Sequence, residues 1–142
     1  MTTNNSSIAN ELCDLENGRL DPKRFPHREH VRLGFEMLAR YPFPEALARF
    51  SNGLRRLAIK GGRPEAYHET ITAAFLALIG ERRLNREYAN WEEFSVRNAD
   101  LLSKDLLRQW YEPAILNSTV ARRTFVLPKP AVSLVKQYEF KT

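Results

Sequence analysis

Apolar residues recur every three or four positions over long stretches of this chain, and that spacing limits the fold more than any other feature. At 100° per residue, the apolar side chains of residues 45–60 fall on one side of a helix. Residues 27–40 and 64–83 have the same helical spacing. Alternation typical of strands occurs only in residues 126–140, where two prolines argue against a central strand. The spacing predicts an all-α fold.

Glycines and prolines indicate where these helices begin and end, because proline cannot continue a helix and glycine commonly follows one. Such residues lie at Gly18, Pro22, Pro26, Pro42, Pro44, Gly61, Gly62 and Pro64. Asn90 and Glu93 have the spacing of a capping box at the start of a later helix. We expect shorter helices over residues 101–110, 113–116 and 120–125.

The composition fits one ordinary globular domain in a reducing compartment. The 142 residues are 43% apolar and 27% charged, which suffices for a core without disulfides or structural metals. Cys13 is the single cysteine, so an internal disulfide is excluded. The N-terminus lacks the pattern of a signal peptide, and the longest apolar run, residues 73–79, is too short to span a membrane. We therefore expect a cytoplasmic protein that does not enter a membrane.

These features together predict a single compact multi-helix domain over residues 1–142. We expect about six to eight helices, an irregular C-terminal tail, and flexible or extended ends at residues 1–5 and 129–142. The net charge of +5 raises the question of nucleic-acid binding. The arginines, however, are scattered in pairs instead of forming a concentrated basic face, so nucleic acid is not the expected partner.

Three histidines, His27, His30 and His68, carry most of the functional information. On the expected helices all three lie on the side that faces the core, and His68 falls at the centre of an apolar stripe. Burying an imidazole without a partner is costly, and clustered inward titratable groups often mark a site. Each histidine taken alone could instead be a hydrogen-bonded core residue, and His27 could simply cap its helix.

This arrangement favours a small enzyme that uses acid–base chemistry on a polar, anionic small molecule. An imidazole kept near neutrality by apolar walls can act as a base or acid near pH 7, which makes His30 and His68 the catalytic candidates, with Glu69 in support. Arg82 could hold an anionic group through a bidentate contact. Tyr67 and Thr72 are further candidates for substrate binding.

A divalent metal, such as zinc, iron or manganese, is an alternative use of the same residues. His27 and His30 are three positions apart, so both rings can reach one point beside a helix. His68 or Glu69 could complete a set of ligands. The pair lacks the glutamate of the H-E-x-x-H motif, which makes the pattern a weak one, and the candidate ligands are His27, His30 and His68.

Several short motifs occur in a fixed order and carry a resemblance. They are F-x-H-x-x-H-V-R (25–32), Y-H-E-T-I-T (67–72), E-R (81–82), W-x-x-F (91–94), N-x-D-L-L (98–102) and A-R-x-x-F-x-x-P (121–128). In these motifs the chain resembles a family of small, uncharacterised bacterial proteins. The resemblance covers about residues 25–128 and implies no particular activity. Lys129 departs from the pattern, in which an acidic residue would follow Pro128.

Two alternatives to the enzyme remain at this stage, and the end of the chain suggests a separate possibility. The chain could be a non-catalytic helical module that binds nucleic acid or a protein partner. The histidines could form a polar network that only fixes packing, in which case His68→Leu would be nearly neutral for stability. Apolar residues near the end, Val132, Leu134, Val135, Tyr138 and Phe140, suggest that the tail covers a groove on its own or a neighbouring subunit, which would give a homodimer.

Overall fold

The computed structural model describes residues 5–129, and this part of the chain is helical and without strands, as the spacing predicts. The α-helices are α1 (Asn5–Glu16), α2 (His27–Arg40), α3 (Phe43–Lys60), α4 (Glu69–Asn85), α5 (Trp91–Arg97), α6 (Pro113–Leu116) and α7 (Thr119–Arg123). Short 3-10 helices join them: η1 (Pro22–Arg24), η2 (Pro64–Ala66), η3 (Ala99–Leu102) and η4 (Lys104–Gln109). Of the tails expected at residues 1–5 and 129–142, residues 1–4 and 130–142 lie outside the described residues.

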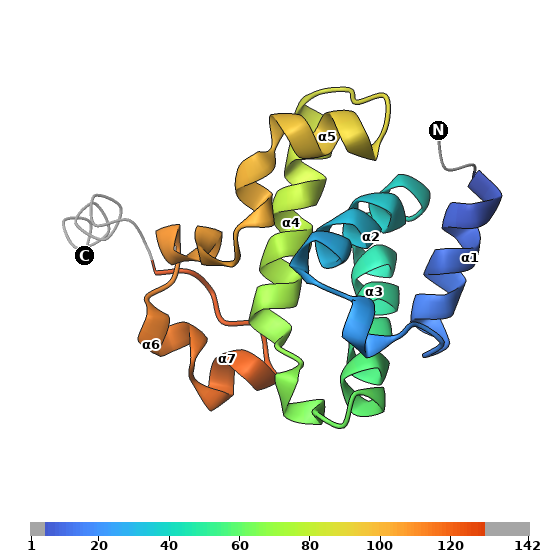
Figure 1. Ribbon diagram of the computed structural model, residues 1–142. Coiled ribbons are helices and arrows are strands. Elements are labelled where there is room, and N and C mark those ends of the chain that lie inside the picture. The colour runs from blue at the N-terminus through green and yellow to red at the C-terminus, as the bar shows by residue number, and fades with distance from the viewer. Residues whose placement is uncertain (1–4, 130–142) are drawn as a thin grey trace.

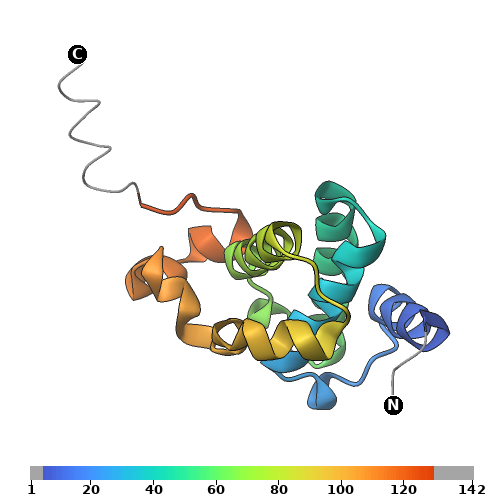
Figure 2. The same cartoon turned by 90° about the horizontal axis from the view of Figure 1, so that it is seen from above.

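Helix α4 runs through the middle of the molecule (Figure 1). Helices α2 and α3 lie on one side of it, with α1 beyond them, and α6 and α7 lie on the other side, while α5 lies across the top and contacts α2. The view from above shows α4 nearly end-on between these two groups (Figure 2). Within residues 5–129, no helix has the length and apolar character needed to cross a membrane.

Two apolar clusters form the core, and α2 and α4 contribute to both. One joins α1, α2 and α3 through side chains such as Leu12, Met37 and Phe50, with Leu76 of α4. The other joins α2 and α4 to the later helices; its buried members are Val31, Phe35, Ala74, Phe75, Ile79, Trp91, Phe94, Leu101, Leu106, Leu107 and Tyr111. Since both clusters share two helices, the short C-terminal elements pack against a frame that the longer helices provide.

The approach of α1 to α3 depends on the absence of a side chain at Gly53. A Cβ at this position would lie 2.7 Å from Cγ of Leu15 and 3.0 Å from the Leu15 carbonyl oxygen. Real Cβ atoms do not come so close to a backbone oxygen and a packed side chain together, so any larger residue would push α1 away.

Two helix ends, those after α1 and before α5, form as the sequence predicts. After α1, Gly18 adopts a φ of 69°, the left-handed conformation that glycine tolerates best. At α5, the Asn90 side chain accepts a hydrogen bond from the Glu93 amide at 3.0 Å, which confirms the predicted cap. The Glu93 carboxylate accepts a bond from the Ala89 amide, one residue earlier than a standard capping box requires.

The expected start of the fourth helix at residue 64 is wrong, and this changes the position of His68. Residues 64–66 form the separate turn η2, and α4 begins at Glu69 with His68 as its N-cap residue. The helix begins there because the His68 ring itself satisfies a free amide of the first turn. His68 therefore does not lie at the centre of a helical stripe. Residues 101–110 also differ from expectation, because they form two 3-10 helices separated at Ser103.

Candidate functional site

His27 and His30 lie together on the first turn of α2, as their spacing predicts. Their ring centroids are 6.3 Å apart and the ring planes are nearly perpendicular. The His27 ring packs edge-on against Phe75 of α4 at 4.8 Å, and its Nε2 lies 2.9 Å from the Leu101 carbonyl oxygen. Since a carbonyl can only accept, Nε2 of His27 donates this bond. His27 thus joins α2 to η3.

His30 differs from the other two histidines because its ring makes no hydrogen bond within the described residues. It is half-buried, and its ring lies 4.6 Å from the ring of Phe25. Burial, together with repulsion from His27 and Lys104 and against a smaller attraction by Glu29, lowers the pKa of His30 to about 4. The ring is therefore neutral at pH 7, with one nitrogen able to accept a hydrogen bond and the other able to donate.

Lys104, at the start of η4, is a charged residue whose field reaches both His27 and His30. Its positive charge lowers the pKa of both His27 and His30. The side chain is exposed and, within residues 5–129, forms no ion pair. Sequence reasoning missed Lys104, because 74 positions separate it from His30 and no motif connects them. An ammonium group beside two neutral imidazoles gives this end of α2 a positive potential.

Both nitrogens of the His68 ring bond to backbone groups of the protein. Nδ1 accepts a hydrogen bond from the Ile71 amide at 3.1 Å, and Nε2 lies 2.6 Å from the Leu116 carbonyl oxygen. The two contacts together fix the tautomer with the proton on Nε2. Burial lowers the pKa of His68, and the positive charge of Arg122 lowers it further. Both ring nitrogens hold backbone groups, so His68 has none left for a substrate or a metal.

Tyr67 and Glu69 form a second cluster with Arg55 of α3. The Tyr67 hydroxyl donates to Oε1 of Glu69 at 2.9 Å, Oε2 of Glu69 pairs with the Arg55 guanidinium, and that guanidinium lies 4.8 Å from the Tyr67 ring centroid. Burial and the adjacent Glu69 carboxylate raise the pKa of Tyr67 to about 12. Glu69 thus joins α4 to α3, and no hydrogen bond links it to a histidine ring.

Thr72 and Arg82, the other candidates for substrate binding, also have partners within the fold. Thr72 is buried, and its hydroxyl donates to the His68 carbonyl at 2.7 Å. Arg82 forms a two-point contact with Asp100, in which Nη2 and Oδ2 are 2.8 Å apart. This contact lowers the pKa of Asp100 and raises that of Arg82. Arg82 therefore joins α4 to η3, and its guanidinium is already occupied by a carboxylate.

The three histidines are not assembled as a metal site. Phe75, which His27 contacts, lies seven residues after His68, a distance of about 10 Å along the helix axis. His27 and His68 also use ring nitrogens on backbone carbonyls. Within residues 5–129, no three His, Cys, Asp or Glu side chains come together in a way that could hold a metal ion. The expected set of His27, His30 and His68 is therefore corrected to the pair on α2.

Comparison with known proteins adds nothing to this geometry, since no protein-family model, curated protein or solved structure matches the chain.

The roles of His68 can be tested by substitution. His68→Leu removes the cap of α4 and leaves the Leu116 carbonyl without its donor, and neither backbone group can be removed in compensation. We expect a loss of about 2–4 kcal/mol in the free energy of unfolding, measured by urea denaturation. His68→Asn, which restores a capping acceptor, should recover about 1 kcal/mol of this. A leucine variant as stable as the original protein would support the packing-only interpretation.

The burial of His30 predicts a pH dependence of stability. Its pKa is 6.5 when exposed and about 4 in the folded protein, so between these values the unfolded chain binds a proton that the folded chain does not. This difference leaves the free energy of unfolding unchanged above pH 6.5. It lowers the free energy of unfolding as the pH falls toward 4, by roughly 3 kcal/mol in all. His30→Gln, which cannot titrate, should show a shallower fall between about pH 7 and about pH 4.5 in urea denaturation. Identical slopes for both proteins would contradict the low pKa.

Proposed function

We propose that this protein is a small cytosolic enzyme that binds an anionic small molecule at the N-terminal end of α2, with His30 as the acid–base residue. The observation that carries this proposal is the state of His30, a half-buried, neutral imidazole with no hydrogen bond to any described residue. Neither ring nitrogen of His30 is among the enclosed polar atoms without a partner, so both can be reached from outside, and a bound substrate could take the place of water there. His27 acts as a positioning residue, because its ring is fixed by Leu101 and Phe75.

Lys104 explains why the substrate would be an anion. Its charge has no partner carboxylate among the described residues and acts on both imidazoles of the pair. An anionic group bound next to Lys104 would offset this repulsion and raise the pKa of His30 toward neutrality. His30 would then be able to accept a proton from the bound substrate, while Lys104 stabilises the negative charge that remains on it.

The other predicted site residues support this proposal only indirectly. His68, Glu69, Tyr67, Thr72 and Arg82 bond to groups of the protein itself, so we assign them to holding the fold around the site. This narrows the expected constellation to His30 and Lys104. In this proposal no side chain of α4 has to contact the substrate.

A screen of small anions tests the proposal. The probes are inorganic phosphate, short phosphate esters and di- and tricarboxylates, followed by thermal shift, with hits then assayed for turnover by proton NMR. A ligand at one hundred times its Kd stabilises by about 2.7 kcal/mol, which is a readily measured rise in Tm. We expect at least one hit to be consumed by the original protein and to lose both effects in His30→Gln and Lys104→Gln.

Arg86→Gln is the matched control, since it removes one exposed positive charge eleven residues after Phe75, about 16 Å along α4. This variant should keep the thermal shift and the turnover. Equal responses in Lys104→Gln and Arg86→Gln would reduce the effect to net charge. A panel without any hit would refute the proposal.

A second candidate function is self-association through the C-terminal part of the chain. Several large apolar side chains of this part are exposed, namely Trp110, Ile115, Val120, Phe125 and Leu127. The apolar residues of the expected tail, 132–140, lie outside the described residues. Binding of nucleic acid has less support, because Arg32, Arg49, Arg55 and Arg82 are paired with carboxylates.

A charge placed on α7 tests the homodimer. Val120 is 62% exposed, so Val120→Glu should leave the fold intact while opposing any apolar contact at this surface. We expect the original protein to have twice the chain mass by light scattering after gel filtration, and the variant to be monomeric. Val96→Glu, at a valine of α5 that is 79% exposed, serves as the control and should stay dimeric. A monomeric original protein would dispose of this candidate.

A further inference from the structure

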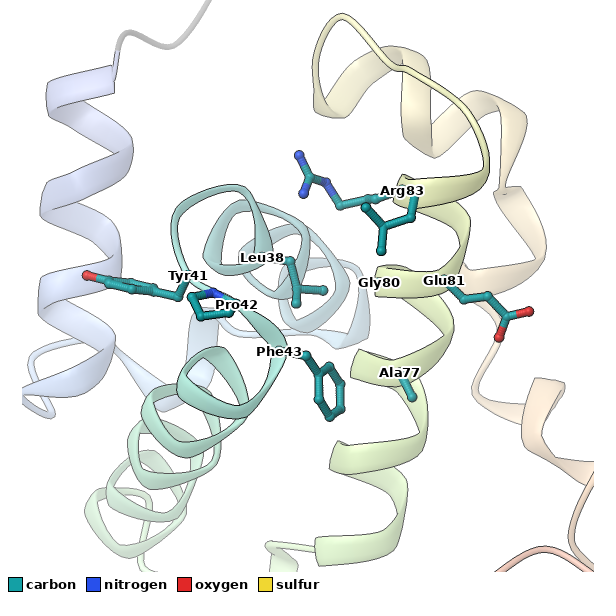
Figure 3. A pocket seen from close by; sticks show the side chains of 9 residues that line it. Leu38, Tyr41, Pro42, Phe43, Ala77, Gly80, Glu81 and Arg83 are labelled. Atoms are coloured by element: carbon teal, nitrogen blue, oxygen red, sulfur yellow. The ribbon is translucent and has the colours of Figure 1, made fainter.

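A surface pocket of about 410 Å³ lies between the end of α2, the turn into α3 and the C-terminal half of α4 (Figure 3). Its lining consists of Leu38, Tyr41, Pro42, Phe43, Ala77, Gly80, Glu81, Arg83 and Leu84. None of these is a histidine, and Leu38 is eight residues after His30, about 12 Å along α2. The pocket is therefore separate from the site proposed for His30, and its volume lies in the range of small-molecule sites.

The walls of the pocket are apolar and partly uncovered. Leu38 and Phe43 point toward the face of α4 that carries Ala77 and Gly80 (Figure 3). Gly80 contributes to the space, because a Cβ there would lie 3.6 Å from a methyl group of Leu38. Phe43 is 39% exposed and Leu84 is 89% exposed, so apolar surface at the rim remains in water. An apolar ligand would remove this surface from water.

Arg83 supplies a positive charge at this pocket. Its guanidinium lies 4.7 Å from the ring centroid of Phe35, and within residues 5–129 it forms no hydrogen bond or ion pair. Nε is buried without a partner, whereas the two terminal nitrogens are not enclosed. Burial lowers the pKa of Arg83, and Glu36, which attracts it from beyond ion-pair distance, only partly offsets this. The charge is thus incompletely compensated by the protein.

The carboxylate of Glu81 does not compensate Arg83 either. In Figure 3 its side chain extends from α4 away from Leu38 and Phe43, while the Arg83 side chain extends toward α2. Arg82, the neighbour of Arg83, provides a contrast, since Asp100 holds it in a two-point contact. A negative group at the Arg83 end of the pocket would therefore meet a guanidinium that has open donors.

We propose that this pocket binds a small amphipathic anion, a carboxylate that carries a short acyl chain or an aromatic ring. The carboxylate accepts hydrogen bonds from the terminal nitrogens of Arg83, and the apolar body lies against Leu38, Phe43 and Ala77. The apolar walls favour this class over a purely polar anion. The guanidinium of Arg83, which has no carboxylate partner among the described residues, favours it over a neutral hydrocarbon.

Titration with octanoate tests the proposal on the full chain, followed by proton–carbon NMR of methyl groups. We expect saturable binding at one site, with shifts concentrated at the methyl groups of Leu38, Ala77 and Leu84. Arg83→Met keeps an apolar stem of similar length and removes the charge, and it should weaken octanoate binding by roughly tenfold or more. Arg86→Met removes an exposed charge three residues away and should leave the affinity unchanged.

A comparison with octan-1-ol tests the role of the charge without any variant, because this alcohol has the eight-carbon chain of octanoate but no carboxylate. It should bind the original protein at least roughly tenfold more weakly than octanoate. Equal affinities for the acid and the alcohol would overturn the assignment of Arg83, as would an Arg83→Met variant that folds and binds octanoate as well as the original. Shifts confined to other methyl groups, or a lack of saturation, would overturn the site itself.

Discussion

Hydrogen bonds from side chains of α2 and α4 to the backbone of the C-terminal third hold the second half of the fold in place. Thr70 is central to them: its hydroxyl donates to the Thr124 carbonyl at 2.8 Å and accepts from the Val126 amide at 3.0 Å. His68 binds the Leu116 carbonyl, and His27 binds that of Leu101. The helices after residue 97 are too short to be stable alone, so these contacts and the shared core determine where they lie.

This constraint explains why polar residues concentrate on helix faces that would otherwise be apolar. A helix that packs only against other helices buries side chains against side chains, but α4 must also satisfy the backbone of irregular segments. Thr70 and His68 are buried for that reason, whereas the buried Thr72 hydroxyl donates to the His68 carbonyl at the start of its own helix. In the sequence such residues resemble a catalytic constellation. In the structure most of them hold backbone groups, and the proposed function therefore rests on His30, whose ring has no hydrogen-bond partner among the described residues.

Local signals could be predicted from the sequence, whereas contacts between distant segments could not. The all-α class, the cap at Asn90 and the turn at Gly18 follow from side chains within a few positions. The acceptors of His27 and His68 are backbone carbonyls 74 and 48 residues away, and a carbonyl leaves no trace in residue identity. The same holds for Arg82, whose partner Asp100 is one of many available carboxylates. The start of α4 was misplaced because histidine is an uncommon capping residue and a proline four positions earlier gave a stronger signal.

Arg82 and Arg83 show how one helix can place identical side chains in opposite environments. Successive residues point about 100° apart, so α4 directs Arg82 toward Asp100 of η3 and Arg83 toward the Phe35 ring of α2. Asp100 stabilises the charge of Arg82 and raises the pKa of Arg82, whereas burial lowers the pKa of Arg83. An arginine held this way costs stability unless something outside the chain compensates it. Because Nε of Arg83 has no partner and its side chain lines an apolar pocket, a bound carboxylate is the compensation that we propose for this charge.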